Sequence, residues 1–251
     1  MNYEKTQKGN PHSLTINQHI FPVKSIERFA DHTGMVDVYL KNNNKRIKIR
    51  PDDNLFCARR IWDQRAEYGF MKEIEDKFQT LADRIINGET TEIDNADKKI
   101  VNDFFGLWNI RAHNKNLPMD NQKIKGVIGL SAHHSIDEQE YLEKHGITAI
   151  RPDLTLPGRN LSGLAIQQNL FLVRKQLEDA KWGVLTAREG EFIVPDNFSN
   201  ARIVPLTPHM CLFSQSENDS IYIDEVRASN RLAVESSKEY YFAKDISKCP
   251  L

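Results

Sequence analysis

The chain has 251 residues, 39% of them hydrophobic and 27% charged, which is enough apolar material for a core and enough charge for a solvated surface. Its 34 basic and 35 acidic residues give a formal net charge of -1, so a global cationic field is excluded and any nucleic-acid contact must come from a local patch. No apolar run approaches the roughly 18 residues of a membrane span, residues 1–10 lack the apolar segment of a signal peptide, and the three scattered cysteines are typical of reduced thiols. We therefore expect a cytoplasmic protein without membrane contact.

The N-terminal part predicts a polar lead-in, a short helix and a hairpin. Residues 1–17 are mostly polar, and we expect them to lead into one α+β domain over residues 18–251. Val23–Ala30 predicts a short helix. Two segments, 35–40 and 46–50, then alternate with period two around an asparagine-rich turn, which predicts a β-hairpin.

Apolar residues at i+3 and i+4 spacing predict three long helices. These helices are expected at Arg65–Asn87, about Asp94–Asn114, and Ser162–Lys181. The short connection between the first two predicts an antiparallel helical hairpin. Ser135 followed by Glu138 matches a capping box, so a further helix is expected to reach His145.

The C-terminal part changes to strand-like segments. Trp182–Thr186 and Glu191–Val194 are expected to pair with each other across the turn at 188–190. Further strands are expected at 201–204 and 210–213, and a final helix from about Ile221 to Ala243. No repeat or long linker divides the chain. The predicted fold class is therefore α+β, with an antiparallel sheet of hairpins packed against several long helices.

Several short motifs occur in a characteristic order. They are His19-x-x-Pro22, Ile26-x-x-Phe29, Ile74-Glu75, Arg111 at a helix end, Trp182 at a strand start, Phe192-Ile193-x-x-Asp196-Asn197, Pro205-Leu206-x-Pro208 and Asn230 in the last helix. This set resembles a large, poorly characterised family of bacterial domains of unknown function. The chain departs from that pattern at Ala112-His113, where the family usually has a proline, and at Asn197-Phe198, where it often has Asn-Pro. Some relatives lie near mobile-element and defence genes, so the resemblance implies a toxin-like effector with a neutralising antitoxin or a defence-complex protein as its partner.

Four polar residues occur where the apolar pattern predicts core: His19, Arg111, Asp196 and Asn230. His19 is either a buried, hydrogen-bonded histidine or a general acid–base group, since its ordinary pKa of about 6.5 suits proton transfer. Arg111 needs a carboxylate partner, for which Asp196 and Glu75 are the candidates. It either locks helices onto the sheet or binds a phosphate. Asp196 is either a turn-capping residue or an acid–base group, and Asn230 is expected to hold a neighbouring loop.

A local group of cations follows the predicted hairpin. The candidate binding residues are Lys45, Arg46, Lys48, Arg50, Arg60 and Asn197. Such a basic ribbon, with Trp62 nearby, suits a phosphate backbone, and a solvated hairpin face is the alternative. The histidines at 113, 133, 134 and 145 match no standard metal spacing, and no phosphate-loop, nucleophile-elbow or HExxH motif occurs. We therefore expect no metal and no cofactor.

Two functional hypotheses result. The first is a toxin-like cytoplasmic effector of a toxin–antitoxin or antiviral defence system that acts on nucleic acid, with RNA favoured, as a metal-independent nuclease. In it His19 is the acid–base group, Arg111 stabilises phosphate charge and Asp196 orients one of them. The second is a non-enzymatic binding module, in which the buried polar residues hold the fold and the hairpin engages a protein or nucleic-acid partner.

Overall fold

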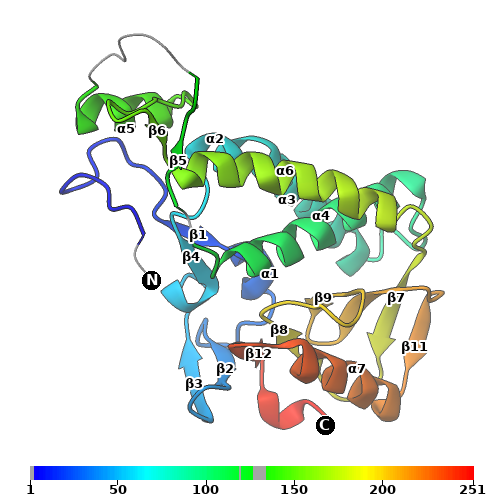
Figure 1. Cartoon of the computed structure of the whole chain (residues 1–251). Helices are drawn as coiled ribbons and strands as arrows, with labels where there is room; N and C mark the ends of the chain where they lie inside the picture. The colour runs from blue at the N-terminus through cyan, green and yellow to red at the C-terminus, as the bar shows by residue number, and fades with distance from the viewer. Residues whose placement is uncertain (1–2, 119, 127–133) are drawn as a thin grey trace.

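A computed structural model describes residues 3–118, 120–126 and 134–251, with long helices lying above the sheets in the view of Figure 1. The helices are α1 Val23–Glu27, α2 Gln64–Ala66, α3 Lys72–Ile86, α4 Asn95–Asn114, α5 Ile136–Lys144, α6 Gly158–Gln176 and α7 Ile223–Ser236. The strands are β1 Asn17–His19, β2 Val36–Leu40, β3 Lys45–Ile49, β4 Cys57–Arg59, β5 Gln122–Lys123, β6 Thr155–Leu156, β7 Trp182–Ala187, β8 Val194–Pro195, β9 Ile203–Thr207, β10 Met210–Ser214, β11 Asp219–Ile221 and β12 Tyr240–Ala243. The predicted α+β class is confirmed.

Two four-stranded sheets form the lower layer. One has the strand order β11-β7-β10-β9 and the other β3-β2-β12-β8, and two short two-stranded pairs, β1-β4 and β5-β6, lie apart from them. The pairing is antiparallel except between β11 and β7. The predicted hairpin is confirmed, with Val36 opposite Ile49 and Leu40 opposite Lys45.

The helical hairpin of α3 and α4 follows the sequence pattern. Asp94 caps α4, because its carboxylate accepts the backbone N–H groups of Ala96 and Asp97. Arg84, late in α3, faces Asp97, early in α4, so the two helices are antiparallel. The predicted helix over 65–87 is interrupted by a π-helical turn at Glu67–Met71, because Gly69 leaves helical geometry there (φ -93°, ψ -118°).

The structure contains the helices predicted up to His145 and from Ser162, but their bounds differ. Ser135 and Glu138 form the predicted capping box, and α5 ends at Lys144. Helix α6 begins at Gly158, not Ser162, directly after Pro157, and it ends at Gln176, not Lys181. The side chain of Asn102 binds the carbonyl of Leu177 at the point where this helix stops.

Two predictions for the C-terminal part are wrong. Segment 191–194 does not pair with β7, whose neighbours are β10 and β11; its end forms β8, which pairs with β12. Asn230 binds the backbone of Glu191 and Ile193 and so holds this segment away from β7. The predicted final helix ends at Ser236, and Tyr240–Ala243 is strand β12. Three consecutive aromatic residues, which favour a strand, start β12.

Buried aromatic rings connect the helical layer to the sheets. Phe78 of α3 stacks on Phe104 of α4 with ring centroids 3.6 Å apart. Phe21 contacts Phe104 and Trp108 on the helical side and Phe242 of β12 on the other. Each such side chain contributes about 1.5–3 kcal/mol when it leaves water. Among the described residues, no helix has the length and apolar content needed to cross a membrane.

Candidate nucleic-acid interface

Two of the three predicted catalytic residues lie together. The guanidinium of Arg111 donates to the carboxylate of Glu75 and, over 3.3 Å, to the carbonyl oxygen of His19. It also lies 5.2 Å from the centre of the Trp62 ring. Arg111 is only 2% exposed. Glu75, rather than Asp196, is therefore the carboxylate partner of Arg111, and the pair ties α3, α4 and β1 together.

The imidazole of His19 is half-buried at this junction. Its Nε2 atom is enclosed and forms no hydrogen bond with any residue that the structure describes. Burial lowers the pKa of His19 below 6.5, and the charge of Arg111 lowers it further, while Glu75 and Asp52 oppose the shift. His19 is therefore neutral at pH 7, but its Nε2 atom does not face an open cavity.

Asp196 binds backbone and, among the described residues, forms no hydrogen bond or ion pair with His19 or Arg111, although it lines a small cavity with their chain neighbours Ile20 and Ala112. Its carboxylate accepts the N–H groups of Lys238 and Glu239 at 2.7–3.2 Å, where the chain passes from α7 into β12. Burial raises the pKa of Asp196, although these two N–H groups oppose the shift. Its own carbonyl accepts the indole N–H of Trp108 at 3.2 Å. The carboxylate of Asp196 thus caps a turn and, among the described residues, is not bonded to His19 or Arg111.

Asn230 and Asn197 are both buried. The amide of Asn230 accepts the N–H of Ile193 and donates to the carbonyls of Glu191 and Pro250, so it holds two segments against α7, as expected of a loop-holding asparagine. Asn197 lines a cavity of about 660 Å³ together with His113.

The cations of the predicted basic hairpin are mostly paired. Arg46 binds Asp37 at 2.7 Å and Asp245 at 3.0 Å, and Asp37 raises the pKa of this guanidinium. Lys48 binds Asp31 at 2.5 Å, and Arg50 binds Asp52 at 3.1 Å. Lys45 is exposed and has no ion pair with a described residue. The hairpin therefore presents much less free positive charge than its sequence indicates.

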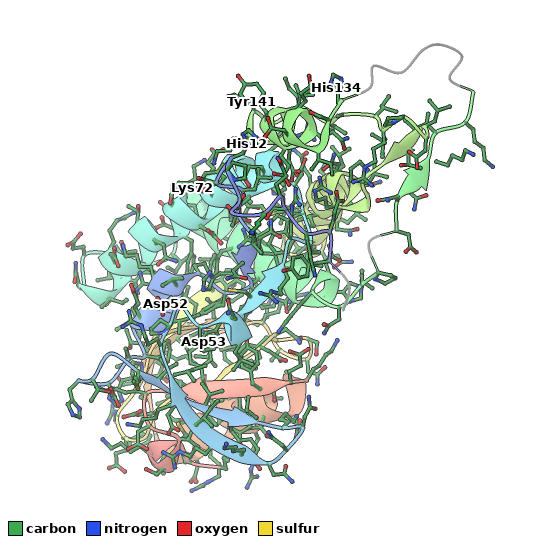
Figure 2. All side chains as sticks on the ribbon, turned by 90° about the vertical axis from the view of Figure 1, so that its left-hand side faces the viewer. His12, Asp52, Asp53, Lys72, His134 and Tyr141 are labelled. Carbon is green, nitrogen blue, oxygen red and sulfur yellow. The ribbon has the colours of Figure 1, made fainter. Side chains whose placement is uncertain are left out.

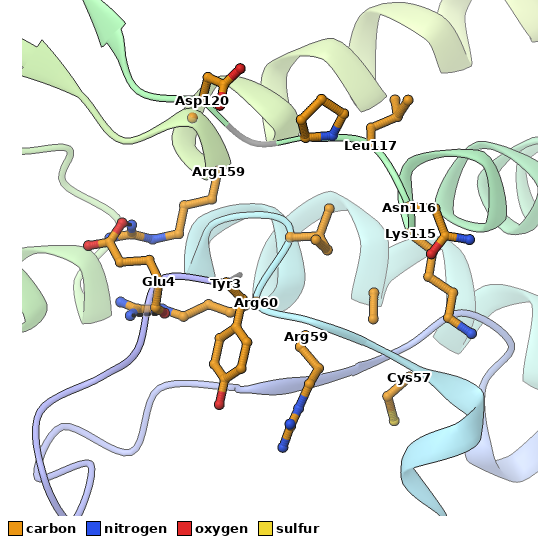
Figure 3. Close-up of a pocket in the computed structure, with 14 residues that line it drawn as sticks. Tyr3, Glu4, Cys57, Arg59, Arg60, Lys115, Asn116, Leu117, Asp120 and Arg159 are labelled. Atoms are coloured by element: carbon orange, nitrogen blue, oxygen red, sulfur yellow. Dashed lines mark hydrogen bonds and ion pairs between the residues drawn. The ribbon is translucent and has the colours of Figure 1, made fainter. Parts of the chain in front are cut away.

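A cleft that the sequence did not predict lies outside the basic hairpin. Residues 3–4, 57–61, 115–118, 120 and 158–159 enclose a cavity of about 610 Å³, which we call the Arg59 cleft. It is formed where the N-terminal segment, strand β4, the end of α4 and the start of α6 meet (Figure 3). Four cations, Arg59, Arg60, Lys115 and Arg159, line it, against two carboxylates, those of Glu4 and Asp120.

Exposed positive charge stands beside an aromatic ring in this cleft. Arg59 is exposed, its guanidinium lies 5.0 Å from the centre of the Tyr3 ring, and it forms no ion pair with a described residue (Figure 3). Lys115 lies across the cleft and binds Glu239 at 2.7 Å and the carbonyl of Leu55 at 3.3 Å. Arg59 therefore keeps its charge available to a ligand, whereas Lys115 is paired with Glu239.

The inner end of the cleft is an ion-pair network. Glu143 of α5 binds Arg60 at 2.7 Å and Arg159 at 2.6 Å. Glu4 binds Arg159 and Arg151 through its two carboxylate oxygens, and its carbonyl accepts from Arg60 at 3.1 Å. Arg60, a predicted binding residue, is 3% exposed. Nothing in the sequence pattern joins these five residues, because they come from five separate places in the chain.

The N-terminal segment reaches this network along α5. His12 binds Asp137 at 2.8 Å and meets the ring of Tyr141 edge-on at 5.9 Å, and Figure 2 shows these rings together at one end of the molecule. Gln7 donates its backbone N–H to Glu140 at 2.8 Å. Residues 3–16 contain no helix or strand, so side-chain contacts hold this segment.

Comparisons of the chain with protein-family models, with curated proteins and with solved structures found no match. The resemblance to a bacterial domain family therefore stays a prediction. Within the described ranges, no three histidine, cysteine or carboxylate side chains gather closely enough to hold a metal ion. His133 lies outside those ranges.

Proposed function

We propose that this chain is a binding module for single-stranded RNA, and that the Arg59 cleft holds the RNA. The observation that carries the proposal is the exposed guanidinium of Arg59, which has no ion pair within the described part of the chain and lies beside the Tyr3 ring in a cavity of about 610 Å³. A cation for the phosphate and a ring for the base are the two elements of single-strand binding sites. The volume also falls within the roughly 300–1,000 Å³ of ligand pockets.

The buried polar residues support binding rather than cleavage. The side chains of Asp196 and Asn230 form hydrogen bonds with backbone groups, and Arg111 is paired with Glu75. These contacts hold the fold in place. Arg59 is the exposed cation of the cleft that can meet a phosphate backbone, and Lys115, paired with Glu239, lies across the cleft from it.

Fluorescence anisotropy with a labelled single-stranded RNA tests this function. We expect Arg59→Gln and Lys115→Gln to weaken binding, and each lost phosphate contact to reduce the slope of log K against log salt by roughly 0.7. Lys45→Gln tests the alternative that the hairpin binds RNA, and we expect little effect. Equal affinity of the wild type and the Arg59→Gln variant would overturn the proposal.

RNA cleavage is the second candidate function. It is favoured by the electrostatic interaction of the His19 imidazole, whose pKa is lowered by burial, with Glu75 and Arg111, which combines a proton acceptor, a carboxylate and a guanidinium. The toxin-like role and the neutralising partner belong to this candidate. Expression should then arrest growth, and a double His19→Ala, Arg111→Ala variant should relieve the arrest at unchanged protein level. Growth arrest that persists in this variant removes both residues from the mechanism.

A further inference from the structure

We infer that the inner end of the Arg59 cleft is a binding site for the terminal phosphate of a nucleic-acid strand, and that Glu4 occupies this site in the structure. The inference rests on the proposed function and names the group that the cleft recognises. The carboxylate of Glu4 stands where the phosphate oxygens would bind, between the guanidinium groups of Arg151 and Arg159. Figure 3 shows Glu4, Arg60 and Arg159 gathered at one end of the cleft.

The charge of the site suits a dianion. Arg60, Arg151 and Arg159 carry three positive charges, and Glu143 supplies one negative charge against them. When Glu4 leaves, the three arginines and Glu143 together have a net charge of +2. A terminal phosphate monoester carries about -1.5 to -2 at pH 7, whereas an internal phosphodiester carries about -1. The terminal group therefore balances the site more fully.

Two of the three arginines of the site are buried. The side chains of Arg60 and Arg159 are 2% and 7% exposed, so a ligand group that reaches them must enter a closed end. The Nε atom of Arg60 is enclosed and has no hydrogen-bond partner among the described residues. Helix α6 begins at the same end with Gly158 and Arg159, without a side-chain cap and without an acidic residue in its first turn. Its first N–H groups favour an anion there.

Glu4 is the carboxylate that a ligand can displace. Its side chain is 41% exposed and lies on a segment without helix or strand, so its removal breaks few other contacts. Glu143 is 6% exposed, belongs to α5 and binds both Arg60 and Arg159. A phosphate therefore exchanges with Glu4, while Glu143 continues to hold the two buried arginines in place.

The test uses one RNA sequence with three kinds of end: a 5′-phosphate, a 3′-phosphate, or hydroxyl groups at both ends. We expect one of the phosphorylated strands to bind the full chain at least about tenfold more tightly than the hydroxyl strand, since one charge-assisted hydrogen bond accounts for roughly that factor or more. Which of the two phosphorylated strands binds more tightly identifies the end that is recognised.

Two variants separate the site from general charge. Glu4→Gln keeps the shape of the side chain and removes the competing charge, so we expect it to increase the preference for the phosphorylated strand. Arg151→Gln should reduce that preference without unfolding the chain, because Arg151 is 19% exposed and lies at the edge of the network. Arg227→Gln is the control: Arg227 pairs with Asp224 on α7, at the other end of the molecule (Figure 1), and its loss should change nothing.

The outcomes distinguish the inference from the proposed function. Equal affinity for all three strands would overturn the terminal-phosphate site and leave RNA binding intact. An unchanged preference in both Glu4→Gln and Arg151→Gln would place the recognition of the end elsewhere, against the inference. If no strand binds, both the inference and the proposed function fail.

Discussion

The guanidinium of Arg111 donates to the carboxylate of Glu75 and so joins the last turn of α4 to the first turn of α3. The two partners differ in burial, because the Arg111 side chain is 2% exposed and that of Glu75 is 23% exposed. Removal of Glu75 therefore leaves a buried group without its partner, whereas removal of Arg111 leaves a partly exposed one. Without Glu75 the buried cation loses its carboxylate, whereas without Arg111 the carboxylate can still reach water.

This difference predicts an asymmetric effect on stability. Removing one partner of a buried ion pair costs about 3–5 kcal/mol, and we expect Glu75→Ala to lie near the lower limit because Glu75 is partly solvated. Arg111→Met should cost less, since its apolar side chain can stay in the same space. Urea denaturation measures both values. Glu73→Ala, at a 65% exposed side chain on the same helix, is the control and should have little effect. A larger loss for Arg111→Met than for Glu75→Ala would contradict the prediction.

Asp196→Ala should destabilise the protein as the loss of a turn cap would. The N–H groups of Lys238 and Glu239 lose their acceptor, and because Lys238 is exposed and Glu239 half-buried, we expect a loss near the lower limit of the about 1–3 kcal/mol of a buried group left unpaired. Asp196→Asn keeps one acceptor oxygen and should cost less. The midpoint of thermal unfolding, Tm, compares the two variants. If neither variant changes Tm, the cap is not structural and an acid–base role gains support.

Stability should fall in acid through His19. Its pKa in the folded chain lies below the ordinary value of 6.5, chiefly because burial disfavours the charged imidazole. The unfolded chain then binds the proton more tightly, so this contribution to stability is full above pH 6.5 and is lost as the pH falls through the folded pKa. We expect the difference in unfolding free energy between the wild type and His19→Gln to shrink below pH 6.5. A difference that stays constant from pH 8 to pH 5 would contradict the lowered pKa.

The amide of Asn230 should be more important for stability than its surface counterpart Asn200. Asn230→Ala removes one accepted and two donated hydrogen bonds between α7 and the segments of Glu191, Ile193 and Pro250, and each buried partner left unpaired costs about 1–3 kcal/mol. Asn200 is exposed, so Asn200→Ala should change stability by less than about 0.5 kcal/mol. Chemical denaturation of the two variants tests the comparison, and similar losses would refute it.

The three cysteines should be unreactive in the folded protein. All are buried, and burial raises the pKa of the Cys57 thiol to about 12 and also raises the pKa values of Cys211 and Cys249. Because the thiolate is the reactive form, a thiol reagent such as DTNB at pH 8 should react slowly. All three thiols should react once urea unfolds the chain. Fast reaction of the native protein would show that a thiol is more accessible than its burial indicates.

Local patterns predicted much of the secondary structure. The cap at Asp94, the capping box at Ser135, the hairpin of β2 and β3 and the stripe of α3 and α4 all depend on residues within a few positions of each other. Such interactions form in the same way wherever the segment lies in the molecule. The sequence therefore predicts them without knowledge of the fold.

Strand pairing was predicted less well. The segments at 182–186 and 191–194 are close in sequence and joined by a glycine-containing turn, which favours a hairpin. In the structure Asn230, far along the chain, binds the second segment and directs it to β12. The predicted last helix extends beyond the observed one for a related reason. Tyr240–Ala243 form a strand because their pairing partners, on β2 and β8, lie far away in the sequence.

By itself the sequence determined the α+β class, the long helices, the hairpin and the presence of polar residues within the apolar pattern, because these depend on periodicity and local hydrogen bonding. Tertiary structure decided that Arg111 pairs with Glu75 and that Asp196 caps a turn. It also decided that most cations of the hairpin are paired with carboxylates, while Arg59 forms no ion pair with a described residue and lies in a cleft built from separate segments. The physical reason is that the charge a ligand meets depends on distance and burial in space, and neither can be read from separation along the chain.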